Sequence, residues 1–135
     1  MNILVCDDEP LARERLSRMV QEAGHKVVAQ ATNGVEALEL VRLHQPDVVF
    51  LDVRMPEMDG LTLLSRLSES RPLIKSVIVS AYGDMDNIRT AMNRGAFDFI
   101  TKPINFEDLS VTLERTVLHV AQLRETLKAL KENNI

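Results

Sequence analysis

The chain has 135 residues, of which 45% are hydrophobic and 27% charged, so we expect one globular domain with a single buried core. The formal net charge of −4 argues against nucleic-acid binding, which needs a basic surface. No apolar stretch approaches the roughly 20 residues of a membrane span, and the first residues lack the basic region of a signal peptide. We therefore expect a soluble, cytoplasmic protein that contacts neither nucleic acid nor membrane.

The first part of the chain alternates strand-like and helix-like segments. An apolar run at 2–7 precedes a helical stripe that begins at Pro10, a residue favoured at the first helical position, and stops at Gly24. A second strand is expected at 26–31. Asn33 then opens a second helix with a capping-box pattern.

The same alternation continues to the end of the chain. Strands are expected at 48–52, 76–80 and 98–101, with helices at 60–70 and 84–93 between them. Most strands are nearly continuous runs of Val, Ile, Leu and Phe, which is typical of parallel strands covered on both faces. The order predicts a doubly wound α/β fold with a five-stranded parallel sheet, for which the flavodoxin-like (βα)5 strand order 2-1-3-4-5 is a common solution.

The last helix is expected to be unusually long, because nothing interrupts it between Asn105 and Asn133. One domain needs this helix only up to His119. We therefore expect a domain at 1–119 and a C-terminal helical extension at 120–135. A seam of residues recurs along the helix at alternating spacings of three and four: Phe106, Leu109, Leu113, Thr116, Val120, Leu123, Leu127, Leu130 and Asn134.

This heptad seam favours a coiled coil that would pair two subunits, or a linker to an effector domain in a longer chain. The alternative is a long amphipathic helix that lies on its own domain.

Four of the expected strands end at charged or hydroxyl side chains. Asp7 and Asp8 follow the first strand, Asp52 ends the third, Ser80 ends the fourth and Lys102 follows the fifth. Because the carboxyl ends of parallel strands meet at one edge of a sheet, these groups should converge there. Taken alone, each is more often a cap, a turn residue or a solvated group. Their coincidence at four strand ends predicts a functional site.

The charges of this cluster indicate its chemistry. Three carboxylates held together need a cation, and Mg²⁺ commonly takes one or two carboxylates and keeps several waters. One Mg²⁺ and Lys102 would bring the local charge to zero, so that the site could accept a phosphoryl group. Asp52 could then act as a nucleophile toward phosphorus and form an acyl phosphate.

Five segments around these strand ends have distinctive sequences: VCDDEP at 5–10, LDVRMPEMDG at 51–60, VSAY at 79–82, GAFDF at 95–99 and TKP at 101–103. With them, residues 1 to about 120 resemble the response-regulator receiver family, the CheY-like phosphoacceptor domains of two-component signalling. The resemblance implies that Asp52 takes a phosphoryl group from a sensor histidine kinase or a phosphotransfer protein, in a reaction that needs Mg²⁺ or Mn²⁺. It also implies a conformational switch that relays the signal, by dimerisation or to an effector domain.

The resemblance also implies roles for individual residues. Asp8 would be a direct metal ligand, Asp7 would act through water or hydrogen bonds, and the backbone carbonyl of Arg54 would be a further ligand. Ser80 would move toward the phosphoryl group and Lys102 would bind it. Phe99 would follow Ser80 by changing rotamer, and the Lys102–Pro103 peptide would be cis.

Two other functions are compatible with the fold. A phosphohydrolase that works through an aspartyl phosphate usually needs a second acid two residues after the nucleophile, where this chain has Arg54. A flavin carrier should have a phosphate loop rich in Ser, Thr and Gly after the first strand, where Asp7 and Asp8 would instead repel phosphate. We therefore expect a phosphoacceptor switch and not a metabolic enzyme.

Overall fold

A computed structural model describes residues 1–133 and contains every expected strand and helix, with bounds shifted by a residue or two. The strands are β1 (Asn2–Cys6), β2 (Lys26–Ala31), β3 (Val48–Asp52), β4 (Lys75–Ala81) and β5 (Asp98–Lys102). The helices are α1 (Pro10–Glu22), α2 (Gly34–His44), α3 (Gly60–Ser70), α4 (Met85–Asn93) and α5 (Phe106–Glu132). Asn134, the last position of the heptad seam, lies outside the described residues.

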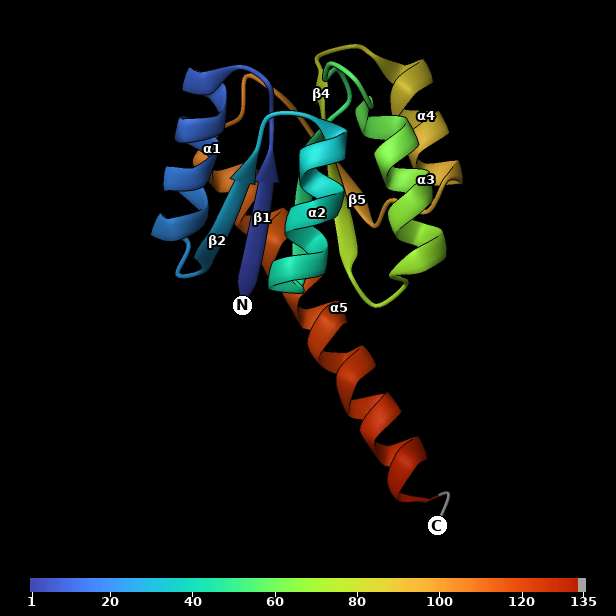
Figure 1. Ribbon diagram of the computed structural model, residues 1–135. Coiled ribbons are helices and arrows are strands. Elements are labelled where there is room, and N and C mark those ends of the chain that lie inside the picture. Colours follow the sequence, from blue (N-terminus) through green and yellow to red (C-terminus); the bar gives the residue numbers. More distant parts are fainter. Residues whose placement is uncertain (134–135) are drawn as a thin grey trace.

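The five strands form one parallel sheet in the order β2-β1-β3-β4-β5, which confirms the predicted fold. Helices α1 and α5 cover one face, and α2, α3 and α4 cover the other (Figure 1). Every residue of the central strand β3 is buried, as expected where helices lie on both faces. All five strands therefore point their carboxyl ends at the same edge of the sheet.

The alternating side chains of the strands divide the core into two layers. Leu4, Leu51 and Ile78 pack toward α2, α3 and α4, whereas Ile3 and Phe50 pack toward α1 and α5. All five side chains have zero exposed surface, and burying one such side chain stabilises the fold by about 1.5–3 kcal/mol. The two layers fix the sheet between the helices, so the loops at its carboxyl edge start from a rigid base.

The helix α5 is longer than the sheet it covers. Its seam residues are buried from Leu109 to Val120, whereas Leu127 and Leu130 are 40% and 60% exposed. Arg124 still contacts the domain, because its guanidinium donates to the Asp47 carboxylate just before β3. Beyond this ion pair the helix runs past the sheet alone (Figure 1). None of the described helices is long and apolar enough to cross a membrane.

Candidate functional site

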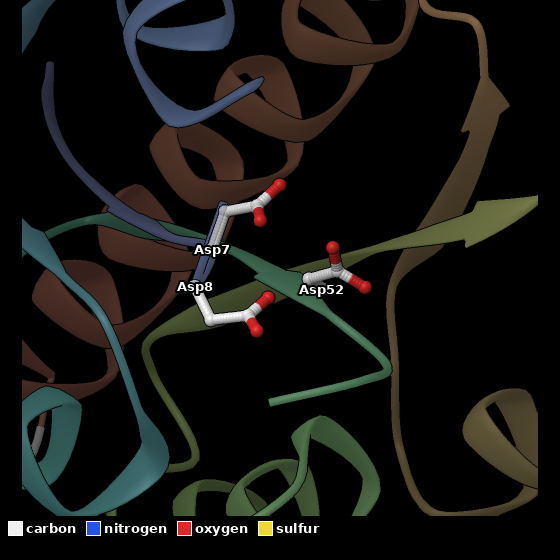
Figure 2. A group of neighbouring side chains, drawn as sticks. All are labelled: Asp7, Asp8 and Asp52. Carbon is white, nitrogen blue, oxygen red and sulfur yellow. The ribbon is translucent and has the colours of Figure 1, made fainter. Parts of the chain in front are cut away.

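Three carboxylates meet at the carboxyl edge of the sheet. Asp7 and Asp8 follow β1, and Asp52 is the last residue of the neighbouring strand β3 (Figure 2). One oxygen from each carboxylate lies within 4.8 Å of the other two. Asp7 and Asp52 are buried, whereas Asp8 is exposed. The expected convergence of these side chains is therefore present.

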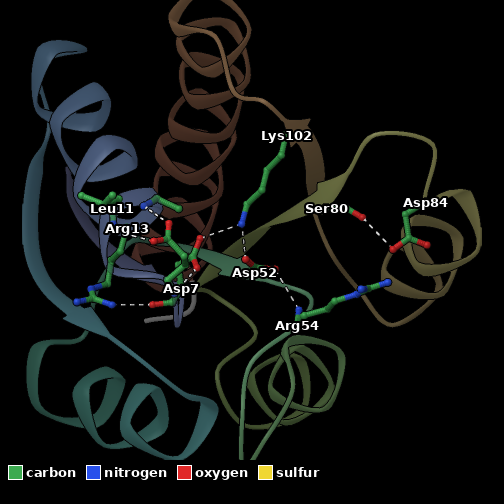
Figure 3. A network of polar contacts seen from close by, with 10 residues as sticks. Asp7, Leu11, Arg13, Asp52, Arg54, Ser80, Asp84 and Lys102 are labelled. Atoms are coloured by element: carbon green, nitrogen blue, oxygen red, sulfur yellow. Dashed lines mark hydrogen bonds and ion pairs between the residues drawn. The ribbon is translucent and has the colours of Figure 1, made fainter.

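The ammonium group of Lys102 lies between two of these carboxylates. Its Nζ donates to Asp52 Oδ2 at 2.6 Å and to Asp7 Oδ2 at 3.1 Å (Figure 3). Lys102 ends β5, two strands away from β3 in the sheet, so the long side chain spans β4 to reach them. One cation thus partly offsets two buried anions, and the net charge of the cluster stays negative.

Backbone N–H groups hold both buried carboxylates in place. Asp7 Oδ1 accepts from the backbone N–H of Glu9 at 2.9 Å, and Asp52 Oδ1 accepts from that of Arg54 at 3.0 Å. Each carboxylate therefore has one oxygen on a backbone donor and the other on Lys102. Neither oxygen of Asp8 has a hydrogen-bond or ion-pair partner within residues 1–133, so Asp8 is the carboxylate with free lone pairs.

The loop after Asp52 is held close to the strand by Gly60. Its backbone N–H donates to the carbonyl of Val53 at 3.0 Å. A Cβ atom at position 60 would lie 2.0 Å from the carbonyl oxygen of Asp52, so no other residue fits without moving the backbone. Asp59 then caps α3 by accepting from the N–H of Thr62 at 2.8 Å. This packing fixes the backbone that carries Asp52.

Ser80, which carries the predicted hydroxyl, lies near Asp52 on the adjacent strand, but its hydroxyl is directed to another partner. Asp52 is paired with Val79 in the sheet register, one residue before Ser80. Ser80 is 1% exposed, and its Oγ lies 3.5 Å from Asp84 Oδ2 at the start of α4 (Figure 3). The structure therefore brings all the predicted side chains to this edge, with Ser80 turned toward α4.

The local charges shift two pKa values at the site. Burial, opposed by the N–H of Glu9, and the neighbouring Asp52 charge together raise the pKa of Asp7 above its usual value. Burial alone would lower the pKa of Lys102, but the hydrogen bonds and charges of Asp52 and Asp7 outweigh it and raise that pKa. Lys102 therefore stays a cation, while the negative charges of Asp7 and Asp52 repel each other.

A hard divalent cation fits this donor set. Oxygen ligands from carboxylates and backbone are those that Mg²⁺ prefers, and an excess of negative charge remains after Lys102 is counted. Asp8, with two free oxygens, is the residue best able to bind a cation directly. The backbone of Arg54 lies beside Asp52 through its N–H, whereas the predicted role of its carbonyl stays a prediction.

Two residues at the site were not predicted to act there. Arg13 of α1 donates from Nη1 to the backbone carbonyl of Asp7 at 2.9 Å, and from Nε to the Gln30 side chain at 3.2 Å. In the sequence Arg13 is one more charged residue on an amphipathic helix. Asp84 is an ordinary helix-start residue in the sequence, and nothing in the pattern indicates its contact with Ser80.

The comparisons with known proteins agree with this geometry. A family model described as the response regulator receiver domain matches residues 3–114. The transcriptional regulatory protein PdtaR of Mycobacterium tuberculosis is 36% identical over 123 residues, which cover 91% of this chain and 58% of PdtaR. The chemotaxis protein CheY of Listeria monocytogenes is 36% identical over 115 residues, which cover 85% of this chain and 97% of CheY.

Solved structures give the same result. NtrX from Brucella abortus matches with a TM-score of 0.88 and 30% identity, over 95% of this chain and 29% of the NtrX chain. A response regulator receiver domain protein from Clostridium thermocellum matches with a TM-score of 0.84 and 29% identity, over 90% of this chain and 98% of the other. The chain thus spans little more than half of PdtaR and a smaller part of NtrX. It belongs to the receiver domain family of the two-component response regulators.

Proposed function

We propose that Asp52 accepts a phosphoryl group from a phosphohistidine on a sensor histidine kinase or a phosphotransfer protein. An Asp52 carboxylate oxygen forms the new O–P bond while the N–P bond of the phosphohistidine breaks. The electron pair of that bond stays on the imidazole nitrogen, which then takes a proton from solvent. The observation that supports this role best is the place of Asp52, buried at a strand end between a cation and a backbone donor.

The proposed metal site consists of Asp7, Asp8, Asp52 and the backbone carbonyl of Arg54, and the cation is Mg²⁺ or Mn²⁺. When bound, a divalent cation offsets charge on the carboxylates and on the phosphoryl oxygens. Asp8 binds the cation directly, because its oxygens have no other partner among residues 1–133. Asp7 keeps its hydrogen bonds to Glu9 and Lys102 and orients the site.

Lys102 and Ser80 bind the phosphoryl group once it is on Asp52. The ammonium group of Lys102 already contacts the Asp52 oxygen, and a short shift would pair it with a phosphoryl oxygen. Ser80 supplies a hydroxyl donor from the adjacent strand. Both residues therefore contact the added group, and the protein acts as a phosphoacceptor switch and does not turn over an external substrate.

The output of the switch uses the C-terminal helix. Residues 1–119 carry the receiver, and 120–135 form the extension that pairs two subunits or leads to an effector domain. The exposed seam residues Leu127 and Leu130 support a partner helix. The contact of Arg124 with Asp47 supports an extension that leaves the domain in a fixed direction.

Phosphotransfer with a labelled donor tests the assignment of Asp52. The chain is incubated with Mg²⁺ and a phosphorylated histidine kinase, or with acetyl phosphate if the kinase is unknown, and the label on the chain is followed. Label is expected on the unmodified chain and not on Asp52→Ala or in the presence of EDTA. Equal labelling of Asp52→Ala would refute the assignment. Asp86→Ala, at an exposed carboxylate of α4, serves as the matched control.

A further inference from the structure

The helix α4 starts differently from the other described helices. The residues before α1, α2, α3 and α5 each accept a hydrogen bond from a first-turn N–H through their side chains: Glu9, Asn33, Asp59 and Asn105. Asp84, the corresponding residue of α4, makes no such bond, although aspartate is among the residues best suited to it. The carboxylate of Asp84 is therefore engaged elsewhere.

The partners of this carboxylate are side chains. Asp84 Oδ2 accepts from Asn87 Nδ2 at 2.7 Å and lies 3.5 Å from Ser80 Oγ. Figure 3 shows Ser80 and Asp84 directed toward each other, away from the pair formed by Asp52 and Lys102. Because Ser80 is 1% exposed, water cannot readily replace Asp84 as the acceptor for its hydroxyl.

A serine hydroxyl has one hydrogen to donate, so Ser80 can donate to Asp84 or to a group on Asp52, but not to both. We propose that Asp84 is a positioning residue that holds Ser80 away from Asp52 in the unphosphorylated protein, and that Asp84 caps α4 once Ser80 is withdrawn. This inference rests on the proposed function, because the group that withdraws Ser80 is the phosphoryl group on Asp52. One exchange of partners thereby links Asp52 to the first turn of α4.

This exchange of hydrogen-bond partners makes the first turn of α4 more ordered. The released carboxylate can accept from the N–H of Asp86 or Asn87, which are the second and third residues of the helix. An N-cap side chain favours the helical state of the first turn by about threefold or more. Tyr82 lies just before this turn and Met85 is its first residue. Their side chains are 86% and 59% exposed, so a change in the order of the turn changes the surface of the protein.

Hydrogen exchange tests the inference without any phosphoryl donor. Ser80→Ala removes one of the two side chains that hold Asp84 Oδ2, the other being Asn87, so exchange at the Asp86 or Asn87 amide, followed by NMR, should slow about threefold or more. Ser80→Thr keeps a hydroxyl and should behave like the unmodified chain. Ser80→Ala combined with Asp84→Ala should lose the protection. Unchanged exchange in Ser80→Ala would overturn the proposal, whether or not Asp52 accepts a phosphoryl group.

Phosphorylation by acetyl phosphate gives the second measurement. Asp84→Ala frees the Ser80 hydroxyl, so the initial rate at which Asp52 is labelled should rise about threefold or more, the factor that one ordinary hydrogen bond supplies. The same change in a Ser80→Ala background should have no effect, because no hydroxyl is left to release. Asp86→Ala removes a neighbouring charge without touching Ser80 and should leave the rate unchanged. A rise that persists without the Ser80 hydroxyl, or an equal rise in Asp86→Ala, would overturn the proposal in favour of a simple charge effect.

Discussion

Lys102 Nζ donates to Asp52 Oδ2 at 2.6 Å, although the two residues are 50 positions apart in the sequence. The same ammonium group contacts Asp7, so it holds together two carboxylates that would otherwise repel each other. Replacing Lys102 should therefore have two separable effects, one on the stability of the fold and one on the proposed phosphorylation of Asp52.

Lys102→Met should reduce the rate at which Asp52 is labelled by acetyl phosphate about tenfold or more. A hydrogen bond to a charged group is worth about 1.5–3 kcal/mol, and the phosphoryl group would lose this donor. Lys102→Arg keeps the charge and should retain part of the rate. Stopped-flow or radiolabel measurements at fixed Mg²⁺ give the comparison, and an unchanged rate in Lys102→Met would contradict the proposed role.

Asp8→Asn should raise the melting temperature in EDTA and abolish most of the rise that Mg²⁺ produces in the unmodified chain. It removes one charge from a crowded anionic cluster, and with it the proposed direct metal ligand. Thermal melts with and without Mg²⁺ provide the measurement. Asp86→Asn, outside the cluster, should respond to Mg²⁺ as the unmodified chain does. A full Mg²⁺ response in Asp8→Asn would show that the ion binds elsewhere.

His25, in the loop between α1 and β2, should make the folded protein less stable in mild acid. Burial and the nearby N-terminal ammonium lower the pKa of His25, although Glu114 opposes them. As the pH falls below about 6.5, the unfolded chain takes up this proton more readily than the folded one, so stability present at higher pH is lost. In urea melts, His25→Gln should depend less on pH between 7.5 and 5.5. His44→Gln, at an exposed histidine of α2, should retain the dependence.

The ion pair between Arg124 and Asp47 should contribute to stability, although Arg124 lies beyond the expected domain boundary at residue 119. Asp47 is 11% exposed and also accepts from the backbone N–H of Asn2 at 2.7 Å, so its position is fixed. A double-mutant cycle of Arg124→Ala and Asp47→Asn should give a coupling of about 1 kcal/mol in urea melts. Lys128→Ala, one turn later, should have little effect. Zero coupling would mean that the helix is free from Arg124 onward.

Leu127→Lys with Leu130→Lys should convert a dimer into a monomer if the extension pairs two chains. Both leucines lie on the heptad seam, and both side chains are exposed in the structure of residues 1–133. Light scattering of the intact chain measures the mass before and after the change. Leu118→Lys is the matched control, because Leu118 is 58% exposed on the same helix but lies off the seam. Equal masses for all variants would refute pairing through the seam.

The sequence predicts the fold and the main site for the same physical reason. Asp52, Ser80 and Lys102 each lie at or next to the carboxyl end of a strand, and a parallel sheet brings its strand ends together whatever the side chains do. Contacts that depend on side-chain direction were not predictable in this way. Arg13 lies on α1 and Asp84 directly precedes α4, positions where a charged residue is usually interpreted as solvated surface or as a cap, and their partners are set by packing alone.

The limits of the extension show the same distinction. The absence of a helix-breaking residue between Asn105 and Asn133 correctly indicated an unbroken helix, which runs to Glu132, because helix breakers act locally. How far that helix stays on the sheet depends on the length of the strands and on Asp47, which is 77 positions from Arg124. No local pattern carries that information.

The unbroken course of α5 restricts how movement can travel through it. The helix begins four residues after Lys102 and runs for 27 residues, about 40 Å, with neither glycine nor proline along its length. The helix therefore has no residue that favours a sharp kink. A displacement of its first turn would therefore be expected to reach its last turn as a tilt or an axial rotation of the whole helix, which the Arg124–Asp47 contact would restrain. Since successive residues are 100° apart around the axis, a rotation of a few tens of degrees would turn Leu130 away from any partner it faced.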